Sequence, residues 1–203
     1  MKVAFGLKAH SGWAALVVIG KQRDELAVVD RRRIELVDEP WAKQPYHAAE
    51  GLEREVARDL VKRGVDTAHR FALTEMKAAI KRERDRENDV LGCSILVGTP
   101  MPDWNTEEIL AVHFRMHKAE GVLFQNALLR ASEKCKLNTL SVLEKELIVQ
   151  ATTQLGDKIV KQIVGLGKSV GPPWAKDQKD AALVALMALS VVSGSGGGVR
   201  GRR

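Results

Sequence analysis

Short apolar segments separated by turns make up the start of the chain. Residues 2–7 are mostly apolar, and the continuous apolar run WAALVVI covers residues 13–19. A run of this kind predicts a strand that is buried on both faces of a sheet. After a turn at residues 20–24, residues 25–29 and 32–37 continue in strand-like fashion as the third strand. Short connections between such segments favour a three-stranded antiparallel meander.

Helical spacing replaces the strand pattern after Pro45. Apolar residues recur three or four positions apart over much of residues 52–80, which is typical of helices with one buried face. Gly64 and Asp66 are expected to break this region into two helices. The apolar run VLGCSILV at residues 90–97 then predicts a buried strand.

The second half of the chain predicts one long helix, one strand and three shorter helices. They span residues 106–134 with a kink near Gly121, then 137–142, 144–154, 157–164 and 177–192. Ser141 is expected to cap the helix after the strand, with Glu144 in the capping-box position.

This order of elements predicts an α/β fold. We expect a five-stranded mixed sheet, made of the antiparallel meander plus two parallel strands and flanked by helices. Residues 1–192 are expected to form one domain with a helical insertion at about residues 45–88. Residues 193–203, rich in Gly, Ser and Arg, are expected to form a flexible tail.

Composition indicates where in the cell the protein is expected to be found, but it does not identify a function. The net charge of +6 permits a polyanionic partner without requiring one. Cys93 and Cys135 form no CxxC pair, which favours a reduced, cytoplasmic location. The N-terminus lacks the pattern of a signal peptide, and the apolar run at residues 181–192 is too short to span a bilayer. We therefore expect a soluble protein with no membrane partner.

Two motifs point weakly to ligands. GLGKSVG at residues 165–171 has the glycines and lysine of a phosphate loop, but Gln162 stands where that loop needs its first glycine. His113 and His117 lie four residues apart on a predicted helix, a spacing that can hold a metal ion. No third ligand is evident in the sequence, so a pair of surface histidines is the expected interpretation.

The sequence DQKD, which opens the last predicted helix, is by itself weak evidence for a metal site. Asp177 and Asp180 lie three residues apart and therefore share one helix face. The helix dipole favours acids at this end, so a stabilising role accounts for them. Carboxylates are also ligands of Mg²⁺, and the small apolar residues that follow would hold both side chains firmly.

Three stretches together carry a family resemblance. Gly6-Leu7 and Ser11-Gly12-Trp13-Ala14, the segment from His117 to Gly156, and AKDQKDAALVALMAL near the end resemble the RuvC-type Holliday-junction resolvases of the RNase H-like superfamily. The connection KQIVGLGKS resembles that family as well. The resemblance covers most of the chain except about residues 45–87, a region longer than the single helix usual in the family.

The resemblance implies metal-dependent hydrolysis of phosphodiesters by two Mg²⁺ ions. The family holds these ions with one acid on the first strand, one at the end of the fourth strand and two on the last helix. Asp177 and Asp180 match the two helix acids, and they are the candidate catalytic and metal residues. Lys8 stands at the first position, and no acid occurs between Asp89 and Asp103. Asp103 or Glu107 could replace the missing acid only in a rearranged site, so Mg²⁺ binding is doubtful.

Lys8 has two alternative roles in this scheme. Its ammonium group could pair with Asp177 or Asp180, or it could contact a phosphate directly. The candidate nucleic-acid-binding residues are the cations around this site and in the tail, namely Lys8, Lys168, Lys176, Lys179, Arg200, Arg202 and Arg203.

Three functions stay open from the sequence. The first is a RuvC-like protein that binds branched or duplex nucleic acid without canonical nuclease activity, and the missing acids favour it. The second is an active Mg²⁺-dependent endonuclease with a rearranged site. The third is a structural or assembly protein, since fold does not fix function. A homodimer or a protein partner is compatible with each of them.

Overall fold

Five strands form one mixed sheet in the order β3-β2-β1-β4-β5, in a computed structural model that describes residues 1–22 and 25–194. β1 pairs antiparallel with β2 and β2 antiparallel with β3, while β1, β4 and β5 run parallel to one another. The strands are β1 Lys2–His10, β2 Trp13–Gln22, β3 Glu25–Glu35, β4 Asp89–Val97 and β5 Asn138–Leu143. The predicted α/β fold with a meander and two parallel strands is therefore confirmed.

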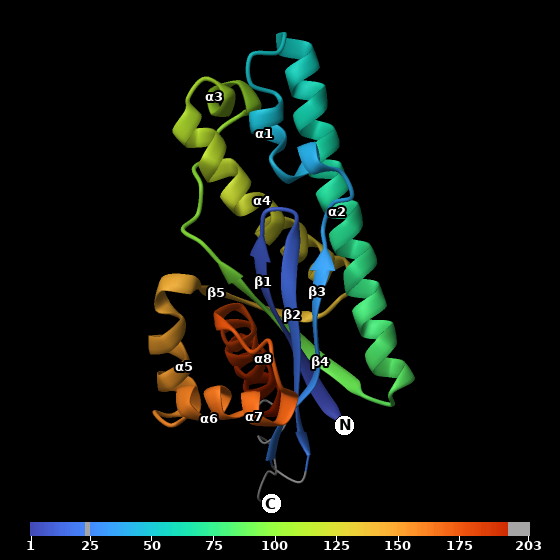
Figure 1. Ribbon diagram of the computed structural model, residues 1–203, viewed down its shortest axis with the longest axis vertical. Coiled ribbons are helices and arrows are strands. Elements are labelled where there is room, and N and C mark those ends of the chain that lie inside the picture. The colour runs from blue at the N-terminus through green and yellow to red at the C-terminus, as the bar shows by residue number, and fades with distance from the viewer. Residues whose placement is uncertain (23–24, 195–203) are drawn as a thin grey trace, which may run out of the picture.

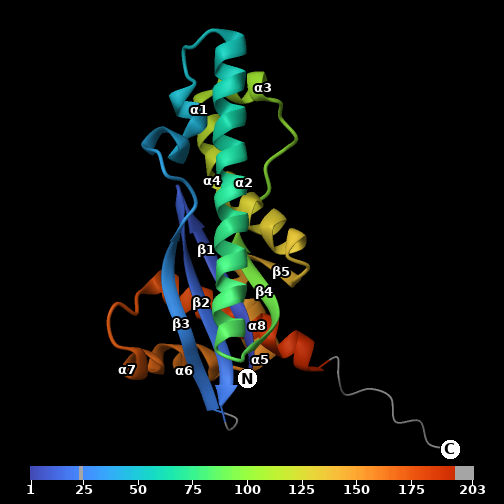
Figure 2. The ribbon, with the colours of Figure 1, turned by 90° about the vertical axis from the view of Figure 1, so that its right-hand side faces the viewer.

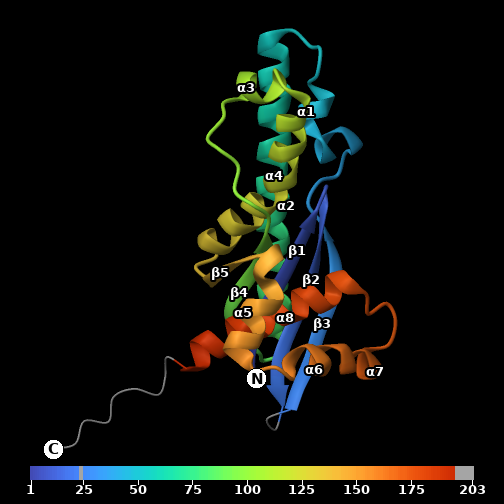
Figure 3. The same ribbon diagram turned by 90° about the vertical axis from the view of Figure 1, so that its left-hand side faces the viewer.

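Helices cover both faces of this sheet. α2 (Arg54–Asp85) and α4 (His113–Lys134) pack on one face (Figures 1 and 2). α5 (Leu147–Leu155), α6 (Ile159–Gly165) and α8 (Lys176–Gly194) lie on the opposite face (Figure 3). The shorter elements are η1 Pro40–Lys43, α1 Pro45–Ala48, α3 Thr106–Leu110, η2 Glu144–Glu146 and α7 Gly167–Val170.

The alternation of side chains along β1 assigns each residue to one of two cores. Phe5 and Leu7 join the core beneath α2 and α4, whereas Ala4 joins the core beneath α8. Lys8 is an even position like Ala4, so it points toward α8. The polar site described below therefore lies between the sheet and α8.

The region after Pro45 differs from its prediction, because α2 is one continuous helix of 32 residues. Gly64 is buried in it, and a Cβ atom at this position would lie 2.4 Å from Cβ of Pro45. Glycine costs a helix interior only about 1 kcal/mol, and here it allows the segment before α2 to pack closely. Tertiary packing thus outweighs the expected break at Gly64 and Asp66.

The expected long helix from Thr106 to Lys134 is also divided, but not by a kink near Gly121. α3 ends at Leu110 and α4 begins at His113. The capping box forms at Asn105 and Glu108, which hydrogen-bond each other's backbone N–H groups. The predicted box at Ser141 and Glu144 is wrong, because Ser141 lies within β5 and η2 begins at Glu144.

The C-terminal helices lie close to their predicted positions. α8 continues to Gly194, and the glycine-rich segment before it contains the short helix α7. Arg200, Arg202, Arg203 and most of the predicted tail lie outside the described residues. Among the helices described, none is long and apolar enough to cross a membrane.

Candidate functional site

The carboxyl ends of the three parallel strands meet the start of α8. Lys8 on β1 is in register with Leu96 on β4, and Leu96 is in register with Val142 on β5. Glu144 follows directly after the last residue of β5. Ends of parallel strands at a sheet edge are a common place for functional side chains in α/β proteins.

Lys8 makes ion pairs with three carboxylates at this edge. Its Nζ atom lies 2.8 Å from Oε1 of Glu144, 3.3 Å from Oδ1 of Asp177 and 2.8 Å from Oδ2 of Asp180. We call these four residues the carboxylate–lysine cluster. Of the two roles left open for Lys8, the ion pair with Asp177 and Asp180 is present. Glu144 is an additional partner that the sequence interpretation had placed in a helix cap.

Burial makes the central pair of this cluster strong. The Lys8 side chain is 9% exposed and that of Asp180 is 11% exposed. Burial alone would lower the pKa of the Lys8 ammonium, but the hydrogen bonds that it donates to Asp180 and Glu144 reverse this effect and raise the pKa well above its usual range. Lys8 therefore carries a full positive charge at any physiological pH.

A lysine and an imidazole ring also contact the carboxylates. Lys176 contacts Asp180 one helical turn away, and its Nζ atom lies 3.7 Å from Oε1 of Glu144. Nε2 of His10 lies 3.1 Å from Oδ2 of Asp177. The three acids thus face cationic or imidazole groups on several sides.

Gly6 allows α8 to approach β1 closely enough for these contacts. A Cβ atom at Gly6 would lie 1.8 Å from the carbonyl oxygen of Ala181 and 2.8 Å from the backbone nitrogen of Ala185. Glycine is the residue that leaves room for such a backbone approach. Gly6 is two residues before Lys8 and lies on the same face of the sheet. It therefore sets the distance between β1 and α8, the helix that carries Asp177 and Asp180.

Arg31 on β3 and a cap at Ala175 fix the segment that enters α8. The Arg31 guanidinium donates hydrogen bonds to the carbonyl groups of Val170, Gly171 and Pro172, at 2.9–3.0 Å, and contacts that of Pro173. The backbone N–H of Ala175 donates to Oε1 of Gln178. These contacts hold the first turn of α8 against the sheet.

An aromatic surface adjoins the cluster at the turn between β1 and β2. The His10 ring stacks on Trp13 with centroids 4.3 Å apart and an interplanar angle of 13°. The Arg33 guanidinium carbon lies 4.2 Å from the centroid of the Trp13 ring. Stacked aromatic and guanidinium groups of this kind can bind nucleobases.

The cluster does not fit a divalent cation as it stands. Mg²⁺ needs carboxylate oxygens that are available as ligands. Here the Lys8 ammonium lies within 3.3 Å of one oxygen on each of the three acids. A cation bound to the same oxygens would meet the positive charge of Lys8 at short range.

The other sequence-predicted residues are distributed around this edge or away from it. Lys168 lies exposed on α7, and half-buried Lys179 lines a small hollow beside Asp180. Glu107 pairs with Arg54 and Arg58, so it does not replace the missing acid. Asp103 borders a separate hollow near the end of β4.

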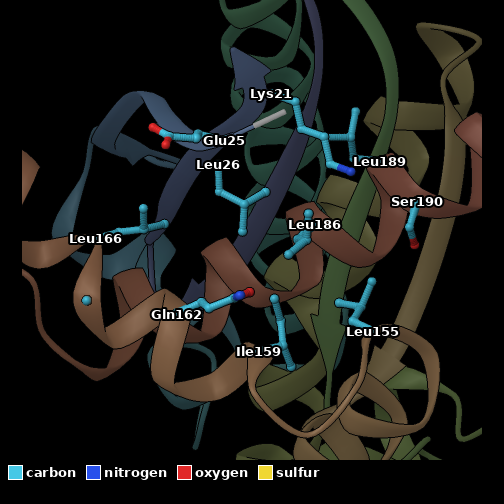
Figure 4. Close-up of a pocket in the computed structure, with 11 residues that line it drawn as sticks. Lys21, Glu25, Leu26, Leu155, Ile159, Gln162, Leu166, Leu186, Leu189 and Ser190 are labelled. Carbon is cyan, nitrogen blue, oxygen red and sulfur yellow. The ribbon is translucent and has the colours of Figure 1, made fainter. Parts of the chain in front are cut away.

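The pocket in Figure 4 is larger than these two hollows. It lies at the opposite end of the sheet from the carboxylate–lysine cluster. It has a volume of about 590 Å³ and lies between the β2–β3 end and α6 and α8. Its walls are mainly apolar, from Leu26, Leu155, Ile159, Leu166, Leu186 and Leu189. The pocket contains no member of the carboxylate–lysine cluster, so it contributes no chemistry to this site.

Comparison with known proteins supports the fold. No family model matches the chain, and the search of curated proteins found no match. Among solved structures, Thermus thermophilus RuvC in complex with a Holliday junction substrate matches with a TM-score of 0.52 and 12% identity, covering 97% of both chains. A second Thermus thermophilus RuvC structure matches with a TM-score of 0.52 and 11% identity, covering 95% of this chain and 97% of that one. An Aquifex aeolicus Ppx/GppA family member matches with a TM-score of 0.37, which is too low to support an argument. The chain therefore has a RuvC-like fold.

Proposed function

We propose that this protein binds nucleic acid through the edge formed by the carboxyl ends of β1, β4 and β5 and the start of α8. We propose that it does not cleave the nucleic acid, because Lys8 takes the place of a divalent cation. The observation that supports this proposal is the position of the Lys8 ammonium within 3.3 Å of Glu144, Asp177 and Asp180. Those carboxylates come from β5's end and from α8, and they converge on one point as ligands of a metal ion would.

Electrostatics explains why the lysine and a metal ion exclude each other. Two unit charges 4 Å apart interact by about 4 kcal/mol at an effective dielectric constant of 20, and a dication doubles that repulsion. In the metal-free protein, the hydrogen bonds to Asp180 and Glu144 raise the pKa of Lys8, so the ammonium is charged at the point where the ion would bind. The lysine thus supplies the neutralising charge and leaves no site for the ion that activates water.

The surroundings of the cluster support binding. Trp13 with Arg33 offers a stacking surface, and Lys168 and Lys176 offer exposed charges for phosphates. Phosphate contacts of this kind need no sequence preference and depend strongly on salt. Branched DNA is the first ligand to test, since the matched RuvC structure holds a Holliday junction.

The experiment compares binding and cleavage in one assay. Labelled junction, duplex and single-stranded DNA are incubated with the protein at about 50 and 200 mM salt, with and without Mg²⁺ or Mn²⁺. We expect salt-sensitive binding to at least one of these DNAs, no metal requirement for it, and no cleavage products.

A matched pair of charge reversals tests whether binding depends on a local surface or only on the net positive charge of the protein. Lys168→Glu, at an exposed candidate nucleic-acid contact on α7, should weaken binding, whereas Lys62→Glu, exposed on α2, should not. Lack of binding at low salt would leave the fold as a scaffold and refute the proposal. Metal-dependent cleavage that disappears in Asp177→Asn would instead identify a nuclease.

A further inference from the structure

Three histidines come together where α1 meets the first turns of α4. Both elements lie in the helical part of the molecule beyond the end of β1 (Figure 1). One ring nitrogen from each of His47, His113 and His117 lies within 4.8 Å of the other two. His113 and His117 are one turn apart on α4, and His47 belongs to α1. The sequence suggested no third ligand for the histidine pair, and the structure corrects this by bringing in His47.

A buried carboxylate orients His47 toward the other two rings. Glu120 is 5% exposed, and its Oε1 atom accepts a hydrogen bond from the backbone N–H of His47 at 3.1 Å. Its Oε2 atom lies 2.6 Å from Nδ1 of the His47 ring. A carboxylate at this distance places the proton on Nδ1 and leaves the lone pair of Nε2 for a ligand, as in carboxylate–histidine–zinc sites.

The spacing of the rings matches a tetrahedral metal centre. Nε2 of His113 and Nε2 of His117 lie 3.1 Å apart. With Zn–N bonds of about 2.05 Å, neighbouring nitrogens around a tetrahedral zinc ion lie roughly 3.3 Å apart. The His47 ring centroid lies 5.1 Å from that of His113 and 4.6 Å from that of His117, so small side-chain rotations bring its nitrogen to the same centre.

The donor set identifies the class of ion. Imidazole nitrogens suit zinc and its neighbours in the first transition row, whereas Mg²⁺ and Ca²⁺ prefer oxygen. His113 and His117 are exposed, so an ion can enter from solvent. The site is also separate in chemistry from the carboxylate–lysine cluster, which offers oxygens alone.

We propose that His47, His113 and His117 bind a first-row transition-metal dication, with Zn²⁺ the best match. Glu120 acts as a positioning residue through His47. Three protein ligands leave a fourth position for water. The bound ion ties α1, which precedes the long helix α2, to the start of α4 and so stabilises the helical end of the molecule.

The test uses the full chain without a histidine tag, freed of metal. Zn²⁺ is titrated in competition with a chromophoric chelator, and Co²⁺ is added separately to record the visible absorption of a tetrahedral site. We expect one equivalent of each ion and a higher unfolding temperature with Zn²⁺. Glu120→Gln should weaken Zn²⁺ binding by about 10- to 100-fold without removing a ligand.

The variants decide where the ion binds. His113→Asn and His117→Asn change exposed side chains, and each should abolish stoichiometric binding and the Zn²⁺-dependent stabilisation while the fold persists. His69→Asn on α2 and the double variant Asp177→Asn/Asp180→Asn should bind Zn²⁺ like the unaltered chain. Failure to bind one equivalent, or unchanged binding in His117→Asn, would overturn the proposal.

Discussion

Nζ of Lys8 lies 2.8 Å from Oδ2 of Asp180, although the two residues are 172 positions apart in the chain. Lys8 is on the central strand β1, and Asp180 is in the first turns of α8, which packs on that strand. The pair therefore links the two elements that define the proposed edge. Loss of either residue would leave the other as a buried charge without its main partner.

Lys8→Met should destabilise the protein by about 3 kcal/mol. Removal of Lys8 leaves Asp180 buried beside Glu144 and Asp177 with only the exposed Lys176 to offset its charge. This remaining contact and the exposure of Glu144 keep the loss near the lower end of the range for buried pairs. Lys176→Met is the control, because this side chain is 73% exposed and should contribute less than about 1 kcal/mol. Urea unfolding measures both, and equal losses would contradict the account.

Above neutral pH, the contribution of Lys8 to stability should decrease only in strongly alkaline solution. A lysine in the unfolded chain has a pKa of about 10.4, and the pKa of Lys8 is higher in the folded protein. Its contribution is therefore complete below about pH 10 and decreases as the pH rises through the folded-state pKa. The difference in unfolding free energy between the unaltered chain and Lys8→Met should stay constant between pH 7 and about pH 10. A decrease within that window would refute the assignment.

Gly6→Ala should destabilise the protein by about 3 kcal/mol or more, because α8 must move away from β1 to admit a methyl group. The same change at Gly121, an exposed helix position with no atom within 4 Å of the added Cβ, should be neutral or stabilise by about 0.5–1 kcal/mol. Denaturant unfolding of the two variants compares an identical chemical change in two environments. Similar effects would mean that the close approach of α8 is not required.

Trp13→Ala should weaken binding to single-stranded or junction DNA by about 1–3 kcal/mol for each base that stacks there. Trp104→Ala is a matched control, since Arg115 lies over the Trp104 ring at 4.8 Å much as Arg33 lies over Trp13. Fluorescence anisotropy with labelled DNA measures both affinities, after unfolding curves have shown that both variants are folded. Equal weakening would show that the surface at Trp13 is not a binding platform.

The antiparallel meander was predictable because short turns join its strands and β2 contains the apolar run WAALVVI, and β4 was predictable from the apolar run VLGCSILV. Asp177 and Asp180 were predictable as a pair from their helical spacing, whereas Lys8 was indicated by the resemblance to the RuvC-type family, in which its position holds the first-strand acid. The continuity of α2 was not predictable, because it depends on contact between Gly64 and Pro45.

Two residues were missed because their partners are distant in sequence. Glu144 is 136 positions from Lys8, although its place directly after a parallel strand was a signal that could have indicated it. His47 lies in a helix of four residues and reaches His113 and His117 only through the packing of α1 on α4. Spacing along one helix could reveal the pair on α4 but not the third ring.

The most direct test of the central claim is Mn²⁺ binding to the carboxylate–lysine cluster, measured by electron paramagnetic resonance. The measurement is made in a His117→Asn background, so that the histidine cluster does not contribute. We predict that the chain that retains Lys8 has no Mn²⁺ site from which Mg²⁺ can displace the ion. Lys8→Asp, which replaces the ammonium with a fourth carboxylate, should create a new Mn²⁺ site. Lys158→Asp, an exposed control on the α5–α6 side, should create no such site. Mn²⁺ binding that requires Asp177 and Asp180 while Lys8 is present would contradict the claim that Lys8 takes the place of the metal ion.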